Sequence, residues 1–219
     1  SNTGGAVVSN AGAWNGNAVN QANVQNLVGA TWTGAIDNQT GGVFSNDGLL
    51  VSAGGATNSG LFVSTGTVNA ALSNAAAGEV QARGALNGAV SNAGRFFVTG
   101  ALNGGGFSFA NTATGQLINL GSVYGGLGAI SNAAGGRIFL GDGVTNGALS
   151  AASLNNAGAI ELMNGRVGDQ LTLSGAYTGV AGSTVSLDVN MAVNTNQADR
   201  IIVGSASGTT VVSIQNVGT

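Results

Sequence analysis

A short pattern built around asparagine recurs ten times along this chain and limits its fold more than any other feature. In each copy an apolar or small residue, a spacer and an Asn lead through a turn of small residues to Gly and then to an alternating apolar stretch. Clear copies span residues 90–100, 130–141 and 154–162. The asparagines that define the copies are Asn10, Asn26, Asn38, Asn46, Asn58, Asn74, Asn92, Asn111, Asn132 and Asn156. A unit this small cannot bury its own apolar side, so neighbouring units must stack, which predicts a solenoid.

The apolar stretches alternate with a period of two between Gly and Asn, which is typical of half-buried strands. The alternating positions are Leu61, Val63, Phe96, Val98, Ile138, Leu140, Ile160 and Leu162. Short strands at near twenty-residue intervals predict an all-β, right-handed parallel β-helix. Some eight to ten rungs would form a rod of roughly 40–50 Å, because adjacent strands lie about 4.8 Å apart. An antiparallel sandwich is the alternative, since regular short strands also suit it.

Asn and Gly are expected at the corners of such a coil because both tolerate positive φ. Stacked Asn side chains also hydrogen-bond to the equivalent Asn one rung away. We therefore interpret the recurring asparagines as a structural device and not as a ligand site.

Composition excludes several kinds of chemistry. The chain has 40 glycines, no proline, no cysteine and no histidine, and its net charge is −3. Its five cations are spread along the sequence, whereas nucleic-acid binding needs clustered cations, so no nucleic-acid partner is expected. Without His or Cys, the usual nucleophilic triads and zinc sites cannot form. We predict no catalytic, cofactor-binding or metal site, no cofactor, and a protein that is not an enzyme.

The acidic residues and the aromatic residues offer weaker candidates. The acids are scattered singly, which disfavours a polysaccharide-active enzyme but leaves it as an alternative; they are Asp37, Asp47, Glu79, Asp142, Glu161, Asp169, Asp188 and Asp199. We interpret Gly141-Asp142-Gly143 as a solvated turn and not as a calcium loop. The aromatic residues considered for partner contact, although such side chains more often fill the core of a β-helix, are Trp14, Trp32, Phe107, Phe109 and Tyr124.

The last part of the chain differs, with longer and more β-branched strands. We predict β-helix rungs over residues 1–165 and a C-terminal capping segment over residues 166–219 that continues the helix. The start at residues 1–5 is typical of a cut into an ongoing repeat, so we expect a piece of a longer precursor.

This tail resembles the region before the membrane barrel in bacterial type V autotransporters, in particular pertactin-like passenger domains. The matching segments are 171–175, 177–179, 185–189, 198–204, 207–212 and 216–218. In that family the stretch is called the autochaperone segment, and it caps the β-helix. The upstream Ser-Asn-Ala-Gly repeats look like the rungs of the family. The Gly-Asp-Ser-Gly motif of its proteolytic members is missing, which implies a non-proteolytic member.

The resemblance implies a secreted or surface-displayed protein that is exported across the outer membrane of a Gram-negative bacterium. The implied function is adhesion to host cells or bacterial self-association, and the implied partners are a host-cell surface protein or glycan, or a second copy. A covalent C-terminal outer-membrane β-barrel is expected in the precursor. A released virulence effector that binds a specific host receptor is the alternative.

Overall fold

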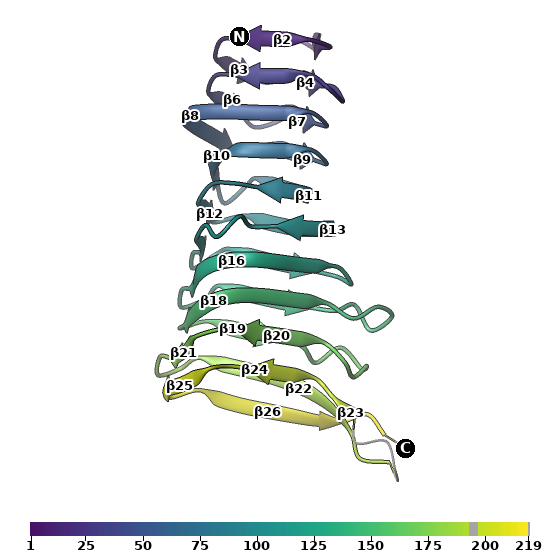
Figure 1. The fold of residues 1–219 in the computed structure, drawn as a ribbon, viewed down its shortest axis with the longest axis vertical. Helices are drawn as coiled ribbons and strands as arrows, with labels where there is room; N and C mark the ends of the chain where they lie inside the picture. The colour runs from purple at the N-terminus through teal and green to yellow at the C-terminus, as the bar shows by residue number, and fades with distance from the viewer. Residues whose placement is uncertain (193–196, 219) are drawn as a thin grey trace.

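The computed structural model describes residues 1–192 and 197–218, and this part of the chain is all-β, without a helix. Its strands stack in parallel into a β-solenoid of about nine turns, with the chain winding from one end of the stack to the other (Figure 1). The predicted parallel solenoid is confirmed, and the antiparallel sandwich is wrong. Among the described residues, no helix has the length and apolar character needed to cross a membrane.

Each turn contributes strands to three faces, and several long strands bend around a corner from one face to the next. Face 1 consists of β1 (Val7–Asn10), β4 (Asn23–Asn26), β7 (Val43–Asn46), β9 (Leu61–Ser64), the starts of β11 (Glu79–Leu86) and β13 (Arg95–Asn103), β15 (Gln116–Asn119), β17 (Arg137–Leu140), β19 (Ala159–Glu161), β22 (Thr184–Asn190) and β26 (Val211–Asn216). Face 2 consists of β2 (Ala13–Asn15), β5 (Thr31–Thr33), the starts of β8 (Leu49–Asn58), β10 (Thr67–Asn74), β16 (Val123–Asn132) and β18 (Ala148–Asn156), the ends of β11 and β13, β20 (Gln170–Leu173) and β24 (Arg200–Ile202). Face 3 consists of β3 (Ala18–Asn20), β6 (Ile36–Asn38), the ends of β8, β10, β16 and β18, β12 (Val90–Asn92), β14 (Phe109–Asn111), β21 (Ala176–Gly179) and β25 (Ser205–Gly208). The short β23 (Gln197–Ala198) pairs antiparallel with β22.

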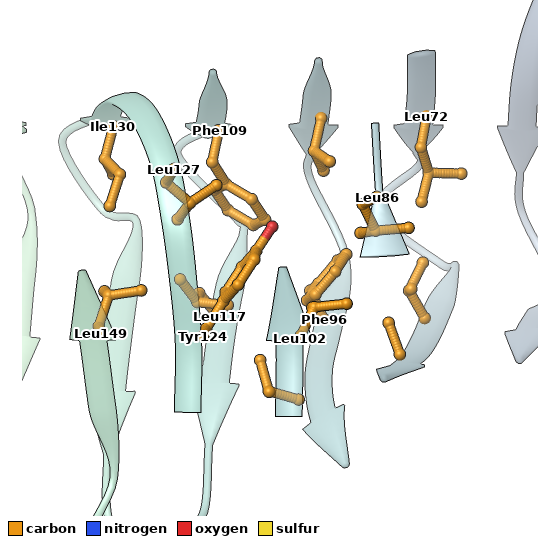
Figure 2. Packing of buried hydrophobic residues seen from close by; sticks show 14 of the residues in the cluster. Leu72, Leu86, Phe96, Leu102, Phe109, Leu117, Tyr124, Leu127, Ile130 and Leu149 are labelled. Atoms are coloured by element: carbon orange, nitrogen blue, oxygen red, sulfur yellow. The ribbon is translucent and has the colours of Figure 1, made fainter. Parts of the chain in front are cut away.

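The core is a continuous column in which like residues lie above like. Trp14 stacks on Trp32 with ring centroids 4.9 Å apart, and Phe44 stacks on Phe62 at 5.2 Å. Further along, aromatic and leucine side chains from all three faces meet in the same interior (Figure 2). The burial of these side chains removes apolar surface that no single rung can cover alone.

The predicted alternation has the correct phase at most rungs and the wrong phase at one. Phe96 and Val98 are buried as predicted, and so are the paired positions in β17 and β19. In β9, however, Leu61 and Val63 face outward while Phe62 fills the core. The register explains the difference, because Phe62 pairs with Phe44 and a shift by one residue exchanges the two faces of a strand.

A buried asparagine ladder runs along the end of face 3. Its members are Asn2, Asn20, Asn38, Asn58, Asn74, Asn92, Asn111, Asn132 and Asn156. Each Nδ2 donates to Oδ1 of the next Asn at 2.7–3.0 Å, and the last donates to the hydroxyl of Tyr177 at 3.2 Å. The same Nδ2 atoms donate to a backbone carbonyl where face 1 begins in the next rung, as Asn92 does to Gln116. The predicted rung-to-rung stacking of Asn is therefore confirmed.

The irregular spacing of the repeats has a simple cause, which is that two ladders interleave in the sequence. Asn10, Asn26 and Asn46 belong to a second, shorter ladder at the end of face 1, where Asn46 donates to Ser64 Oγ at 3.2 Å. The sequence pattern assigned these residues to the same series as the face 3 ladder and missed Asn2 and Asn20.

The role expected for Asn at the corners also needs correction. Apart from Asn2, which forms an isolated bridge with Asn20, the ladder asparagines are the last residues of extended strands. Positive φ angles occur at turn glycines such as Gly41 and Gly135. At several of the Asn turns, the following Gly is required because another atom lies too close for a Cβ. A Cβ on Gly78 would lie 2.3 Å from Asn74 Oδ1, and one on Gly115 would lie 2.3 Å from Asn111 Oδ1.

The predicted strands of the tail form further rungs in parallel register. Residues Thr184–Val189 of β22 pair with residues 211–216 of β26, and β21 pairs with β25. The predicted boundary between residues 165 and 166 remains a prediction.

Candidate binding hollow and lateral surface

The corner between faces 1 and 2 lengthens toward the C-terminal end of the solenoid. It consists of residues 47–48 after β7 and residues 65–66 after β9, and then of residues 141–147 after β17 and 162–169 before β20. Figure 1 shows the later loops projecting from the side of the stack near β18, β20 and β23. This growth, which the sequence shows as widening intervals between repeats, creates the most irregular surface of the described residues.

Three buried aspartates, which we call the aspartate clamp, hold these loops in place. Asp169, Asp188 and Asp199 are 1%, 0% and 5% exposed. Asp199 Oδ1 accepts hydrogen bonds from the N–H groups of Gly168 at 2.9 Å and Asp169 at 3.0 Å, and its Oδ2 accepts one from Asp188 at 2.7 Å.

The other two carboxylates of the clamp reach the same loops. Asp188 Oδ2 accepts the N–H groups of Asn164 and Gly165, each at 2.7 Å. Asp169 accepts the N–H of Gly147 and the side-chain amide of Asn164, each at 2.6 Å. One oxygen, Asp188 Oδ1, has no partner among the described residues. The clamp thus joins the loops of two successive rungs through charge-assisted hydrogen bonds.

Burial determines how the clamp titrates. Burial raises the pKa of Asp169 to about 6, and the charges of Asp199 and Asp188 add to the rise, while hydrogen bonds from Gly147 and Asn164 oppose it. Burial likewise raises the pKa of Asp199 against three backbone N–H donors. Removal of a carboxylate from water disfavours its charged form, so Asp169 and Asp199 take up a proton at a higher pH than an exposed carboxyl group does.

A hollow of about 540 Å³ opens on the outside of this corner. It is lined by Asn146, Arg166, Val167, Gly168, Gln170, Gln197, Ala198 and Arg200. Gln170 and Arg200 are neighbours on the outer side of face 2, because β20 and β24 pair with these residues in register. Arg166 donates from Nη1 to the carbonyl of Val144, which anchors its side chain to the preceding loop. The hollow therefore presents two guanidinium groups and three carboxamides.

The lateral surface of face 3 is chemically different. One residue per rung points outward and lies in register with the next; we call this set the face 3 strip. It consists of Thr57, Ser73, Ser91, Ala110, Ser131, Asn155, Thr178 and Ser207. From Thr57 to Ser207 the strip carries no charge, whereas the same register continues toward the N-terminal end through the acidic Asp37 and through Val19. Beside the strip runs a shallow groove of about 360 Å³ lined by small residues such as Gly55, Ala71 and Ala89.

The aromatic candidates divide into two groups. Trp14 and Phe107 are 42% and 43% exposed, whereas Trp32, Phe109 and Tyr124 are buried in the core. The buried three are therefore not available for partner contact. Burial also raises the pKa of Tyr124, whose hydroxyl has no partner in the described part of the chain.

The acidic residues are less scattered than the sequence suggested. The expectation of single, separated acids is wrong for Asp169, Asp188 and Asp199, which the fold brings together. A signal was present, because Asp169-Gln170-Leu171 and Asp199-Arg200-Ile201 have the same pattern and stack in adjacent rungs. The clamp oxygens face the interior and accept N–H groups. Within the described residues, no group of three or more His, Cys, Asp or Glu side chains is arranged to hold a metal ion.

The segment Gly141-Asp142-Gly143 forms a turn. Asp142 Oδ1 accepts the N–H groups of Val144 at 2.8 Å and Thr145 at 2.6 Å. These hydrogen bonds lower the pKa of Asp142, and the Thr145 N–H contributes most. The carboxylate is therefore used to close its own loop, as the interpretation of a solvated turn predicts.

Comparison with known proteins adds a partial relative. The probable autotransporter YfaL of Escherichia coli (strain K12) is 32% identical over 110 residues, an alignment that covers 44% of this chain and 8% of the relative. The chain fits a pertactin-like autotransporter passenger domain. The aligned part of the chain spans only a small part of the length of this relative. No family model and no solved structure matches the chain.

Proposed function

We propose that this passenger domain is displayed on the surface of a Gram-negative bacterium, or secreted from it, and works by non-enzymatic adhesion. The form of adhesion that the geometry favours is self-association between copies on neighbouring cells, and attachment to host cells is the second form. The partial autotransporter relative supports export to the cell surface.

The observation that carries the proposal is the face 3 strip. Its residues repeat with the rung spacing of about 4.8 Å, so two antiparallel copies can place hydroxyl and amide groups opposite each other over the rungs from Thr57 to Ser207. Uncharged groups that both donate and accept hydrogen bonds are complementary to themselves and cause no like-charge repulsion. Each contact is weak, and the many contacts gain strength from avidity.

The small residues beside the strip support close approach. Gly55, Ala71 and Ala89 leave the groove shallow, so the backbone of a partner is not held away by long side chains. Rigidity adds to this effect, since the asparagine ladder fixes the strip from inside and little conformational entropy is lost on contact.

The test is a settling assay with a non-clumping laboratory bacterium that displays the domain. The variant Ser91→Glu/Ser131→Glu places like charges on the strip, and it should abolish clumping without unfolding the domain. The matched control, Ser45→Glu/Gln116→Glu, adds the same charge to the outer side of face 1 and should clump like the parent.

The outcomes separate the candidate functions. Equal clumping by both variants would refute the role of the strip. Cells that attach to host cells without clumping would favour host adhesion over self-association. Soluble domain that triggers signalling in cultured cells would favour a released effector.

A further inference from the structure

We propose that the hollow lined by Arg166 and Arg200 binds an acidic saccharide, which it recognises by a carboxylate or sulfate group. The proposal goes beyond self-association and does not depend on it, because the binding of a free oligosaccharide is measured without cells.

The first argument is the distribution of cations. Arg95 and Arg137 form ion pairs with Glu79 and Glu161 on face 1, with N–O distances of 3.3 Å and 2.5 Å. Arg166 and Arg200 form no carboxylate ion pair within the described residues, although the chain carries more acids than cations. Two of the five cations therefore line one hollow without a direct ion pair, so their N–H donors are open to an external anion.

The second argument is the geometry of the guanidinium groups. A guanidinium presents five N–H donors in a planar fork that matches the oxygens of carboxylate and sulfate. The contact of Arg166 with the Val144 carbonyl fixes its position while using one donor. Arg200 begins β24, so a regular strand sets the direction in which its side chain leaves the backbone.

The third argument is the lining between the two arginines. Asn146, Gln170 and Gln197 each offer a donor and an acceptor, which is what the hydroxyl groups of a sugar require. A volume of about 540 Å³ is within the range of sites for small organic ligands, which is roughly 300–1,000 Å³. An inorganic anion would use the arginines and leave the carboxamides without a role.

The fourth argument is preorganisation. The loops that carry Asn146 and Arg166 are held by the aspartate clamp, through Gly147 N–H to Asp169 and through the Asn164 and Gly165 N–H groups to Asp188. Several buried carboxylates are costly, and here they hold the loops that line the hollow. A site that is already ordered loses little entropy when a ligand binds.

The experiment is calorimetric titration of the soluble, full chain with four probes at matched ionic strength. The probes are a heparin-derived tetrasaccharide, a hyaluronan tetrasaccharide, neutral chitotetraose and inorganic sulfate. We expect saturable binding of at least one acidic tetrasaccharide, and at least tenfold weaker binding of chitotetraose and inorganic sulfate. Binding of the sulfated probe alone identifies sulfate as the recognised group, and binding of hyaluronan identifies carboxylate.

Three variants locate the site. Arg200→Gln and Arg166→Gln, which lie on different segments, should each lower the affinity at least tenfold, while Arg83→Gln removes an exposed arginine elsewhere and should change it less than twofold. Circular dichroism checks that each variant is folded, and shifts in the side-chain amide resonances of Gln170 and Gln197 report the location directly.

The proposal is overturned if no acidic tetrasaccharide binds, or if chitotetraose binds equally well. It is also overturned if Arg83→Gln weakens binding as much as the other two variants, since binding would then follow overall charge. A domain that clumps but binds no saccharide refutes this inference alone, and one that binds saccharide without clumping refutes only self-association.

Discussion

The asparagine ladder and the aspartate clamp both provide hydrogen bonds to buried backbone groups, but one uses carboxamides and the other carboxylates. Both consist of polar side chains buried at corners of the solenoid, and both satisfy backbone groups there. A carboxamide donates and accepts, so Asn92 accepts from one rung and donates to the next, and the pattern repeats without limit. A carboxylate only accepts, so Asp199 must be surrounded by N–H groups, and the loops must bulge to supply them. The solenoid is therefore uniform where the buried corner side chains both donate and accept hydrogen bonds, and irregular where they only accept them.

The most severe test removes the C-terminal region altogether. Deletion of residues 171–219 should expose Leu149, Leu154 and Ile160, each worth about 2 kcal/mol of burial, and lower the melting temperature by roughly 10 °C or more. Thermal denaturation and refolding yield measure the effect.

A second, shorter deletion removes residues 1–22 at the other end. It should cost less, because Trp14 in that rung is already 42% exposed. Equal losses from the two deletions would show that the C-terminal rungs have no special capping role.

A second test replaces amide by acid within the ladder. Asn92→Asp should destabilise the fold by about 3–4 kcal/mol, because a carboxylate oxygen would face the acceptors Asn111 Oδ1 and Gln116 O without a donor. Urea unfolding measures the change, and Asn155→Asp on the exposed side of β18 is the control, with less than about 0.5 kcal/mol expected. A similar cost for both variants would contradict the ladder as a donor–acceptor relay.

The reverse exchange tests the clamp. Asp199→Asn should cost about 2 kcal/mol, since its amide would point an N–H at one of three backbone donors. In Asp37→Asn, on the outer side of face 3, the amide oxygen can still accept from Gln39 and the amide N–H can donate to the Thr57 hydroxyl, so the change should be nearly neutral. If Asp199→Asn is also neutral, the comparison between amide and acid fails.

The smallest expected effect is a dependence on pH that is confined to the clamp. The pKa of Asp169 is about 6 in the folded state and 3.8 in an ordinary setting. Between pH 7 and pH 5 the folded state therefore takes up a proton that the unfolded state does not, so stability rises as the pH falls through 6. We expect the melting temperature to rise by roughly 2–4 °C, and the rise to become smaller in Asp169→Asn, where only the raised pKa of Asp199 remains. A parent protein that melts at the same temperature at both pH values would rule this out.

The regular part of this molecule could be predicted from the sequence, whereas the irregular part left only weak signals in it. Asn92, Asn111 and Asn132 predict stacking because the same residue recurs at the same place in a rung. The sequence does not show which residues of β9 face the core, since Leu61, Phe62 and Val63 are all apolar. Only the pairing of Phe62 with Phe44 decides which of them points inward.

The clamp and the hollow were not predicted, for a physical reason. Asp188 and Asp199 lie on either side of a loop, so no fixed spacing relates them, and only the fold brings both to Asn164 and Gly168. Likewise Arg166 and Arg200 meet because loop length, which the repeat does not determine, places them over one corner.

The asparagine ladder also gives the rod a direction that the three faces do not reveal. Every side-chain amide donates a hydrogen bond to the following rung. The same Nδ2 also donates to a backbone carbonyl, which fixes the orientation of the amide. The aligned side-chain dipoles add along the axis, so the two extremities differ electrically as well as in sequence. A rung joining at the Asn156 side must bring an oxygen, as the Tyr177 hydroxyl does, whereas one joining at the Asn2 side must bring an N–H or O–H. Such a polar column can lengthen head to tail, but two identical extremities cannot merge.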